Sequence, residues 1–399
     1  MTKNDDKRIP ALRFKGFNDD WAQRKLGKLS KIKSGQTPSS HDNSNYYPPQ
    51  INWIRTGDLT NSKIISVDKL LSKKGAEKLT VFPKNTVVIA MYGGFNQIGR
   101  TGLLTFPSTI NQALAAISPN PLINSNFLLQ LLNKNIYTWR RVAASSRKDP
   151  NITKKDIENQ KFDFPSVFEQ EKISKLISLI DKLITLQQRK LKQYQLIKKW
   201  LCSVVFNDTV HDDNNILFSN RVKANQLFES ISKKGFKDLP VLSASQEKGM
   251  VFRDDISKNI TYTNSNLNNY KLVFPGNFVV HLRSFQGGFS YSDKIGIASP
   301  AYTIFGFKDN IKYDPIFWKE KFKSYNFIQL LKKVTYGVRD GRSISFSDFL
   351  SLYLTFPDIE IQKKIGKCFK ALDNQTSDQQ CIIQQLKQLK QFLLQNMFI

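Results

Sequence analysis

The sequence has few of the residues that form disulfides and metal sites. Its three cysteines, Cys202, Cys368 and Cys381, are odd in number and none forms a CxxC pair. This pattern disfavours a disulfide framework and favours a reducing cytoplasm. Cys202 lies on an apolar helical stripe, which favours a buried thiol over a nucleophile. The three histidines, His41, His211 and His281, are scattered and have no cysteine pairs beside them, so we predict no metal site.

Long apolar runs and catalytic signatures are also missing. No run approaches the ~20 apolar residues that span a bilayer, and the opening residues MTKNDDKRIP lack the apolar core of a secretory signal. No P-loop occurs, and Gly93, Gly94 and Gly99 do not have GxGxxG spacing. The segment YPPQ at 47–50 lacks the Asn or Asp of an aminomethyltransferase signature. Gln362 stands where a nuclease motif after Pro357 would need lysine. We therefore predict no catalytic residue in this chain.

Acidic residues are scarce relative to basic ones. The chain has 60 Lys and Arg against 33 Asp and Glu, a formal charge of +27. Such an excess repels itself unless a polyanion is the usual partner. Nucleic acid is the leading candidate and an anionic membrane surface the alternative. Basic residues are spread through both halves of the chain, which favours a long binding face over a membrane-anchoring patch.

The chain does contain an internal duplication. At an offset of 192 residues, 13 of the 43 gapless pairs between 164–206 and 356–398 are identical. Upstream, Val81-Phe82-Pro83 returns as Val273-Phe274-Pro275. A repeat of about 190 residues is too long for a solenoid. We therefore predict two similar units joined head to tail and related by a pseudo-two-fold axis.

Each repeat changes character once. Residues 20–163 and 216–355 contain short β-rich runs broken by Gly and Pro, although residues 125–141 look helical. After each Phe-Pro pair, apolar residues recur in steps of three and four for about 40 residues. Ser166 with Glu169 has capping-box spacing, and Asp358 is the N-cap candidate of the second helix.

The two long helices need a partner for their apolar stripes. They can pack on their own domains, dimerise between molecules or pair with each other, and tethering favours pairing within the chain. A glutamine interrupts each stripe, either fixing the register on the seam or facing water just beside it. The predicted pairing residues are Ile173, Ile180, Ile184, Gln187, Leu191, Ile365, Leu372, Gln379, Ile383 and Leu386.

Several motifs together resemble the specificity (S) subunit of type I restriction–modification enzymes. They are PALRFKGFNDDW at 10–21, RKLG at 24–27, WIRTGDL at 53–59, PVLSASQEKG at 240–249, and Phe-Pro followed by Gln-x-Lys-Ile at both helix starts. The resemblance covers essentially the whole chain. The second half departs from the pattern at residues 216–231, which have no equivalent of Trp21 or Gly27.

The resemblance implies an α+β fold in which two β-rich target-recognition domains are separated by two long helices that pair as an antiparallel coiled coil. The expected segments are 1–163, 164–207, 208–355 and 356–399. Each domain would read one part of a bipartite target in double-stranded DNA. The helices would bind two modification (methyltransferase) subunits, with restriction/translocase subunits joining through the complex. S-adenosylmethionine, ATP and Mg would belong to the partner subunits, with no cofactor in this chain.

Polar loops that follow apolar strands are the predicted DNA-binding positions, since base edges are read by Arg, Asn, Gln and aromatic side chains on rigid supports. An ordinary solvated hairpin is the alternative for each. These residues are Arg55, Tyr92, Asn96, Gln97 and Arg100 in the first half and Ser243, Gln246, Lys248, Arg283, Gln286 and Tyr291 in the second.

One basic pair, Arg147 and Arg339, recurs just before both helices, with Lys148 and Arg342 alongside. An arginine shared by two halves that read different bases fits a phosphate contact. A salt bridge to the recurring Asp156 and Asp348 is the alternative.

Three functions remain at this point. The chain is a DNA-reading subunit without an active site, an enzyme with unrecognised motifs, or a stand-alone DNA-binding repressor or architectural protein. Turnover by the purified chain with S-adenosylmethionine or ATP would reveal the second. Tight binding without a partner would reveal the third.

Overall fold

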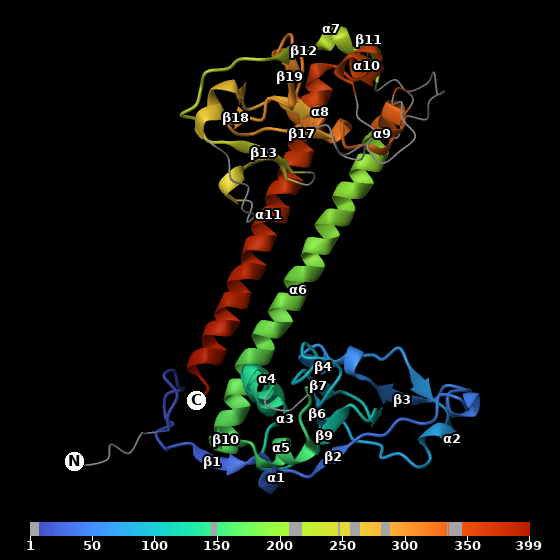
Figure 1. The fold of residues 1–399 in the computed structure, drawn as a ribbon, viewed down its shortest axis with the longest axis vertical. Coiled ribbons are helices and arrows are strands. Elements are labelled where there is room, and N and C mark those ends of the chain that lie inside the picture. The colour runs from blue at the N-terminus through green and yellow to red at the C-terminus, as the bar shows by residue number, and fades with distance from the viewer. Residues whose placement is uncertain are drawn as a thin grey trace, which may run out of the picture. The chain divides into compact units, whose positions relative to one another are not determined.

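The computed structural model describes residues 8–144, 150–206, 218–245, 248–255, 264–280, 288–332, 334 and 345–399 (Figure 1). The chain forms two compact units. Unit 1 consists of Met1–Gln187 with Ile382–Ile399, and unit 2 of Gln188–Cys381. Each compact unit therefore contains one predicted β-rich domain together with parts of both predicted helices.

The first half of unit 1 is built on a five-stranded sheet of order β2-β9-β6-β7-β4. Its strands are β2 (Ile32–Ser34), β9 (Leu114–Ile117), β6 (Val87–Ala90), β7 (Thr101–Leu104) and β4 (Ser62–Ile64). Every residue of β6, β7 and β9 is buried, and β6 and β9 accordingly read as continuous apolar runs. A smaller sheet holds β5 (Leu70–Leu71), β3 (Ile51–Ile54) and β8 (Thr109–Ile110), and β1 (Ala22–Lys25) pairs with β10 (Lys161–Phe164).

The helices of unit 1 correct one expectation. Residues 125–141 form two helices, α3 (Ser125–Lys134) and α4 (Ile136–Ala144). The break lies at Asn135, whose side-chain amide donates to the Leu131 carbonyl while its own carbonyl accepts from Thr138 N. Asn competes with the helix for backbone groups in this way. The remaining short helices are α1 (Leu26–Leu29), η1 (Asn43–Asn45), η2 (Thr56–Asp58), α2 (Lys73–Ala76) and α5 (Lys154–Asn159).

Unit 2 has a four-stranded sheet of order β12-β19-β16-β17. Its strands are β12 (Phe228–Ile231), β19 (Thr303–Phe307), β16 (Phe278–Val280) and β17 (Phe289–Tyr291). The strand pairs are β11 (Asn220–Lys223) with β20 (Tyr353–Phe356), β13 (Leu242–Ser245) with β14 (Gly249–Phe252), and β15 (Lys271–Val273) with β18 (Gly296–Ala298). The helices are α7 (Ala224–Leu227), η3 (Arg253–Asp255), η4 (Asn264–Asn269), α8 (Pro315–Lys321), α9 (Tyr325–Lys332) and α10 (Phe346–Ser351).

The start of the second repeat follows the first despite its altered sequence. β11 leads into α7 as β1 leads into α1, and each pairs with the strand that precedes its long helix. Leu26 N donates to Gln160 O, and Ala224 N donates to Leu352 O, two carbonyls 192 residues apart. The backbone pattern therefore survives without the tryptophan and glycine of the first copy.

Phenylalanine forms most of the unit 2 core. Phe228, Phe278, Phe305 and Phe349 are almost fully buried, and neighbouring rings lie 4.8–6.4 Å apart. Offset and edge-on ring contacts add to the free energy of burial. Much of the high Phe content is thus structural.

The long helices are α6 (Val167–Phe206) and α11 (Ile359–Asn396). Ser166 Oγ accepts from Glu169 N at 3.3 Å, but the Glu169 carboxylate binds Arg13 instead of completing the capping box. Asp358 precedes α11 as expected, and its side chain accepts from Asn220 at 3.2 Å.

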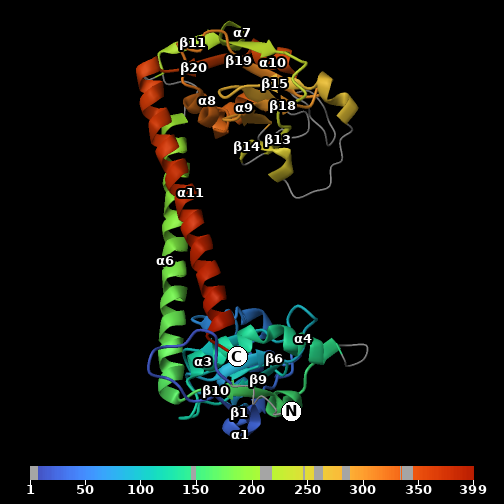
Figure 2. The same ribbon diagram turned by 90° about the vertical axis from the view of Figure 1, so that its left-hand side faces the viewer.

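The two helices pair antiparallel. Within unit 1, Ile173, Ile180 and Ile184 share a core with the far end of α11, and Lys390 Nζ lies 2.6 Å from Asp181 Oδ1. Within unit 2, the end of α6 meets the start of α11, where the Phe206 and Phe369 rings stack at 5.9 Å. Figure 2 shows the helices side by side in each unit.

Burial along the seam differs between the predicted pairing residues. Ile173, Ile180, Ile184, Gln379 and Ile383 are buried, whereas Gln187, Leu191, Ile365, Leu372 and Leu386 are half-buried. Gln379 is 3% exposed, so it does not face water, and Gln187 takes an intermediate position. A buried Gln on an apolar stripe can fix the register of the pair.

Candidate nucleic-acid interface

In unit 1, the loop of residues 92–100 joins β6 to β7 and presents polar and aromatic side chains. Gly99 N donates to Ala90 O, and Ala90 N donates to Arg100 O, which closes a hairpin. Gly93 and Gly99 have φ of +121° and +76°, which L side chains rarely adopt. A Cβ at Gly99 would also meet Trp139 of α4 at 3.0 Å. The glycines therefore fix the loop against α4 and leave Phe95 and Asn96 exposed.

α4 completes this surface with residues that sequence reasoning missed. The Arg140 guanidinium lies 5.9 Å from the rings of both Phe95 and Tyr137, and its Nη2 donates to Asn96 O at 3.4 Å. Tyr137 is 74% exposed. The i,i+3 spacing places Tyr137 and Arg140 on one face of a helix. That face could be recognised as part of the surface only if the break at Asn135, which separates α4 from α3, were known.

The predicted residues of unit 1 that the structure describes lie on or beside this loop. Arg55 precedes η2, and its Nε lies 3.9 Å from the Asp58 carboxylate. The next residue, Thr56, lies 3.4 Å from where a Cβ of Gly93 would stand, so η2 borders the loop. Asn96 is exposed, while Gln97 and Arg100 are half-buried.

Polar atoms in this region differ in how well they are paired. The Tyr92 hydroxyl donates to Gln112 O at 2.7 Å, and burial raises its pKa, so it stays protonated. Within the described residues, Gln97 Oε1 and Arg140 Nε make no hydrogen bond although both atoms are buried. Buried polar atoms without partners are uncommon in folded proteins, and a bound ligand can supply the partner. Arg147 and Lys148 lie outside the described residues.

The predicted residues of unit 2 that the structure describes, Ser243, Lys248 and Tyr291, lie on or beside the β13–β14 hairpin and β17. Ser243 Oγ accepts from Arg253 Nε at 3.0 Å, and Lys248 is exposed at the hairpin turn. A Cβ at Gly249 would lie 2.4 Å from Tyr291 O, so β14 lies directly against β17. Gln246, Arg283, Gln286, Arg339 and Arg342 lie outside the described residues.

Tyr291 is more buried than expected for a residue that contacts DNA bases. It is half-buried, its ring lies 5.7 Å from Phe278, and Lys319 Nζ lies 5.9 Å from its ring. Burial raises the pKa of its hydroxyl, which therefore remains a neutral donor. Its role in DNA contact stays a prediction.

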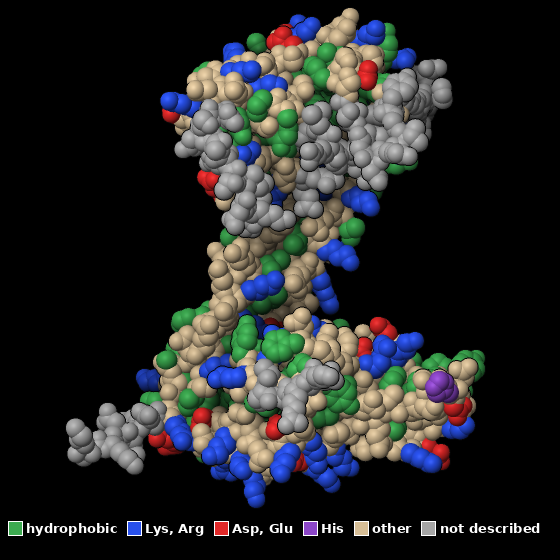
Figure 3. Space-filling view, viewed as in Figure 1, with side chains coloured by type: hydrophobic (Ala, Val, Ile, Leu, Met, Phe, Trp, Pro, Cys, Tyr) green, Lys and Arg blue, Asp and Glu red, His purple; other side chains and the backbone are tan. Residues whose placement is uncertain are grey.

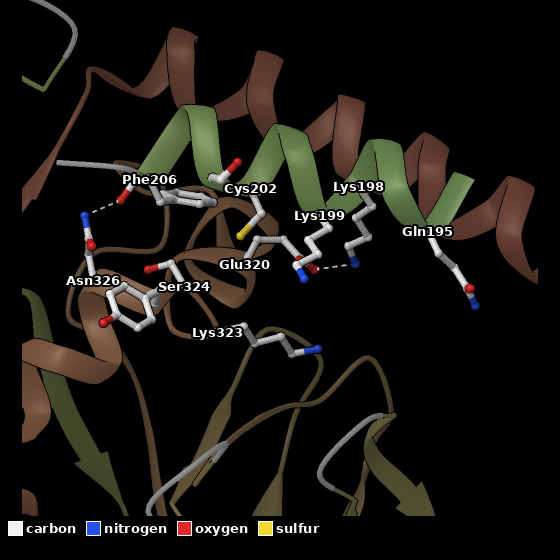
Figure 4. Close-up of a pocket in the computed structure, with 11 residues that line it drawn as sticks. Gln195, Lys198, Lys199, Cys202, Phe206, Glu320, Lys323, Ser324 and Asn326 are labelled. Atoms are coloured by element: carbon white, nitrogen blue, oxygen red, sulfur yellow. Dashed lines mark hydrogen bonds and ion pairs between the residues drawn. The ribbon is translucent and has the colours of Figure 1, made fainter. Parts of the chain in front are cut away.

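Unit 2 also contains a cavity of about 600 Å³ between the end of α6 and the α8–α9 segment (Figure 4). Lys198 Nζ lies 3.1 Å from Glu320 Oε1, and Asn326 Nδ2 donates to Phe206 O at 2.8 Å. Burial raises the pKa of the Cys202 thiol to about 11. The thiol is thus protonated at neutral pH and unsuited to nucleophilic chemistry.

Neither a metal cluster nor a membrane span is found in the described part of the chain. Among those residues, no three or more His, Cys, Asp or Glu side chains are grouped to hold a metal ion. No described helix is both long enough and apolar enough to cross a membrane.

Comparison with known proteins gives one consistent family. The family model of the type I restriction modification DNA specificity domain matches residues 18–195 and again residues 219–388. The type I restriction enzyme MjaIX specificity subunit of Methanocaldococcus jannaschii is 26% identical over 186 residues. That match covers 45% of this chain and 41% of the relative, so it spans less than half the length of that curated protein.

Two solved structures share the fold. The type I restriction-modification S subunit from M. genitalium superposes with a TM-score of 0.64 at 14% identity, covering 98% of this chain and 99% of that one. A structure from work on complex assembly and conformational transition of the type I R-M system gives 0.53 at 15% identity, covering 94% and 96%. At such identities the likeness concerns the fold alone.

Proposed function

The chain belongs to the type I restriction–modification DNA specificity family, and from this membership we propose that it recognises a bipartite sequence in double-stranded DNA, one part per unit. The observation that carries this proposal is one framework supporting two different surfaces. Gln170 and Gln362 accept from the N-cap residues Asn124 and Asp314 and donate to Pro165 O and Pro357 O.

The loops do not repeat in this way. Residues 92–100 read YGGFNQIGR, and the stretch 192 residues later, which includes β17, reads SFQGGFSYS, with no identical position. Shared scaffold and different loops suit a protein that reads two unrelated half-sites. In unit 1, the neighbouring Phe95, Asn96, Tyr137 and Arg140 supply the hydrogen-bonding and apolar groups for such reading.

Partner binding finds support on the outer faces of the long helices. Ile197 and Trp200 of α6 are exposed in unit 2, and their counterparts at the 192-residue offset, Leu389 and Phe392 of α11, are exposed in unit 1. Trp200 is 62% exposed and Phe392 52%. Exposed aromatic residues on a helix are typical anchors of protein interfaces. A patch that occurs twice suits two copies of one modification subunit.

Catalysis and cofactors then belong to the assembled complex. S-adenosylmethionine, ATP and Mg would be bound by the modification and restriction/translocase subunits that this chain directs to DNA. The three free cysteines fit a reducing cytoplasm.

The test is to assemble the chain with its modification subunits and map the methylated motif by methylation-aware sequencing. We expect a bipartite asymmetric motif with an unread gap. The pair Asn96→Ala and Arg140→Ala should relax one part of the motif and leave the other intact. The exposed Lys84→Ala in the same unit serves as the control and should change neither part. Relaxation of both parts by the loop variant, or a continuous motif, would contradict the proposal.

A further inference from the structure

A second basic surface lies in unit 1 away from the loop of residues 92–100. Residues 24–33, RKLGKLSKIK, contain five cations and no carboxylate. All five side chains are exposed: Arg24, Lys25, Lys28, Lys31 and Lys33. We call this surface the basic face. Figure 3 shows Lys and Arg side chains gathered along the lower edge of unit 1, where β1, α1 and β2 lie.

The neighbouring elements do not neutralise these charges. Lys25 stands directly opposite Lys161 in the β1–β10 pair, where like charges repel. α5 packs on α1 at the contact between Gly27 and Glu158 and adds the exposed Lys155. Two nearby carboxylates pair with other cations, Glu158 with Lys154 and Asp163 with Arg8, while Asp156 accepts hydrogen bonds from Thr153, the N-cap of α5.

The second repeat shows that the fold does not require this charge. The equivalent β11–α7–β12 segment, residues 220–231, reads NRVKANQLFESI, with one Arg, one Lys and one Glu. The same backbone thus carries a net charge of +5 over residues 22–33 in unit 1 and of +1 over residues 220–231 in unit 2. Charge concentrated on one copy, at a cost in self-repulsion, indicates a polyanion as its partner.

We propose that the basic face binds the phosphate backbone of double-stranded DNA without reading its sequence. Residues 22–34 and 153–164 include no exposed large apolar side chain. Protein interfaces are depleted in Lys and enriched in aromatic anchors, and single strands are bound by exposed aromatics for stacking. A surface of four lysines and one arginine without exposed aromatics matches neither, whereas it suits phosphate contacts.

The contact is separate from the candidate interface. Figures 1 and 2 share their vertical axis, and in both α1 and β1 lie at the lower edge of unit 1 and α4 at its upper edge. The basic face therefore meets a different DNA segment from the one at the loop and α4. The inference goes beyond the reading of two half-sites and does not depend on it.

The test compares two triple variants of the full chain with the same net charge. Lys28→Gln, Lys31→Gln and Lys33→Gln remove three charges from the basic face, and Lys73→Gln, Lys78→Gln and Lys84→Gln remove three exposed charges elsewhere in unit 1. Fluorescence anisotropy with a short duplex of random sequence gives affinity over a range of salt concentrations. Equal thermal midpoints confirm that all proteins remain folded.

We expect the basic-face variant to bind the random duplex at least tenfold more weakly at low salt. Its slope of log affinity against log salt should fall by about 0.9 for each lost phosphate contact, or by up to about 2.7. The control variant should lose much less, and the methylated motif should be unchanged in both. Equal losses of duplex affinity in the two variants would show that only the net charge of the chain matters, and would overturn the proposal. Unchanged duplex binding with loss of a partner subunit would also overturn it, because the face would then bind protein.

Discussion

The internal repeat places one ion pair in two different surroundings. Lys390 and Asp181 in unit 1 correspond to Lys198 and Asp373 in unit 2 at the 192-residue offset, and both pairs lie 2.6 Å apart. In unit 2, Asp373 also lies 2.7 Å from Lys319, and Glu320 lies 3.1 Å from Lys198. Four charges that sum to zero thus replace an isolated pair.

We predict that Asp373→Asn destabilises unit 2 more than Asp181→Asn destabilises unit 1. Asp181 is 40% exposed and has one cation, so its loss should cost about 0.5 kcal/mol, as for other exposed pairs. The Asp373 side chain is 32% exposed and accepts from two lysines. Its loss leaves two cations facing Glu320 alone, which should cost about 2 kcal/mol.

Native-state hydrogen exchange resolved by peptide can measure each unit separately, which matters because two units need not unfold together. Peptides from residues 195–206 and 366–378 report on unit 2. About 2 kcal/mol corresponds to exchange roughly 30-fold faster in Asp373→Asn, with strands of unit 1 unaffected. Equal costs for the two variants, or a cost for Asp373→Asn below about 0.5 kcal/mol, would refute the reasoning.

The pH dependence provides a second check. Burial alone would raise the pKa of Asp373, but hydrogen bonds from Lys198 and Lys319 outweigh it and lower the pKa below 3.8. A carboxylate with a lowered pKa stabilises the fold above its unfolded value, and that stability is lost as pH falls through the folded value. The difference between wild type and Asp373→Asn should therefore be constant at neutral pH and disappear as the pH falls through the lowered folded-state pKa of Asp373.

Two further predictions concern the long helices. Ile180→Lys should destabilise unit 1 by about 3–5 kcal/mol, because it buries an unpaired charge at a site only 4% exposed. The control, Leu179→Lys at an exposed site, should cost less than about 1 kcal/mol. Chemical denaturation measures both, and similar costs would contradict the packing of Ile180 against α11. Trp200→Ala and Phe392→Ala should each reduce the number of bound modification subunits from two to one, measured by light scattering of the reconstituted complex. The control, Ile311→Ala at an 87% exposed site, should leave both subunits bound. Retention of both subunits in the two helix variants would contradict the proposed docking sites.

The sequence predicted the elements that repeat and obey a strict period. The 192-residue offset and the three-and-four spacing of apolar residues identified α6 and α11 to within a few residues of their ends. Tethering favoured pairing of the two helices within one chain, and the family resemblance implied that the pair is antiparallel. These features depend on local patterns, which sequence displays directly.

The candidate interface could be predicted only in part. The glycine-rich loop was visible as a polar segment after an apolar strand, but its contact with Tyr137 and Arg140 was not. That contact depends on where Asn135 ends α3 and on how Trp139 meets Gly99, a tertiary fit that no periodicity encodes. The start of the second β-rich domain was obscured because Ser219 and Asn225 stand where the first has Trp21 and Gly27, while the backbone hydrogen bonds persist.

The end of α11 belongs to unit 1 and the end of α6 to unit 2, and this arrangement has a consequence for folding during synthesis. Unit 1 holds the first domain to emerge, yet its core includes Leu393, Met397 and Phe398, and the Phe398 ring stacks on Phe127 at 5.0 Å. Those residues are translated after all of unit 2, whose own helix end at Phe206 precedes its domain. Domains usually complete folding in the order of translation. Here the second unit can complete its core first. The core of the first unit stays incomplete, with the Phe127 site uncovered, until residue 398 has been synthesised.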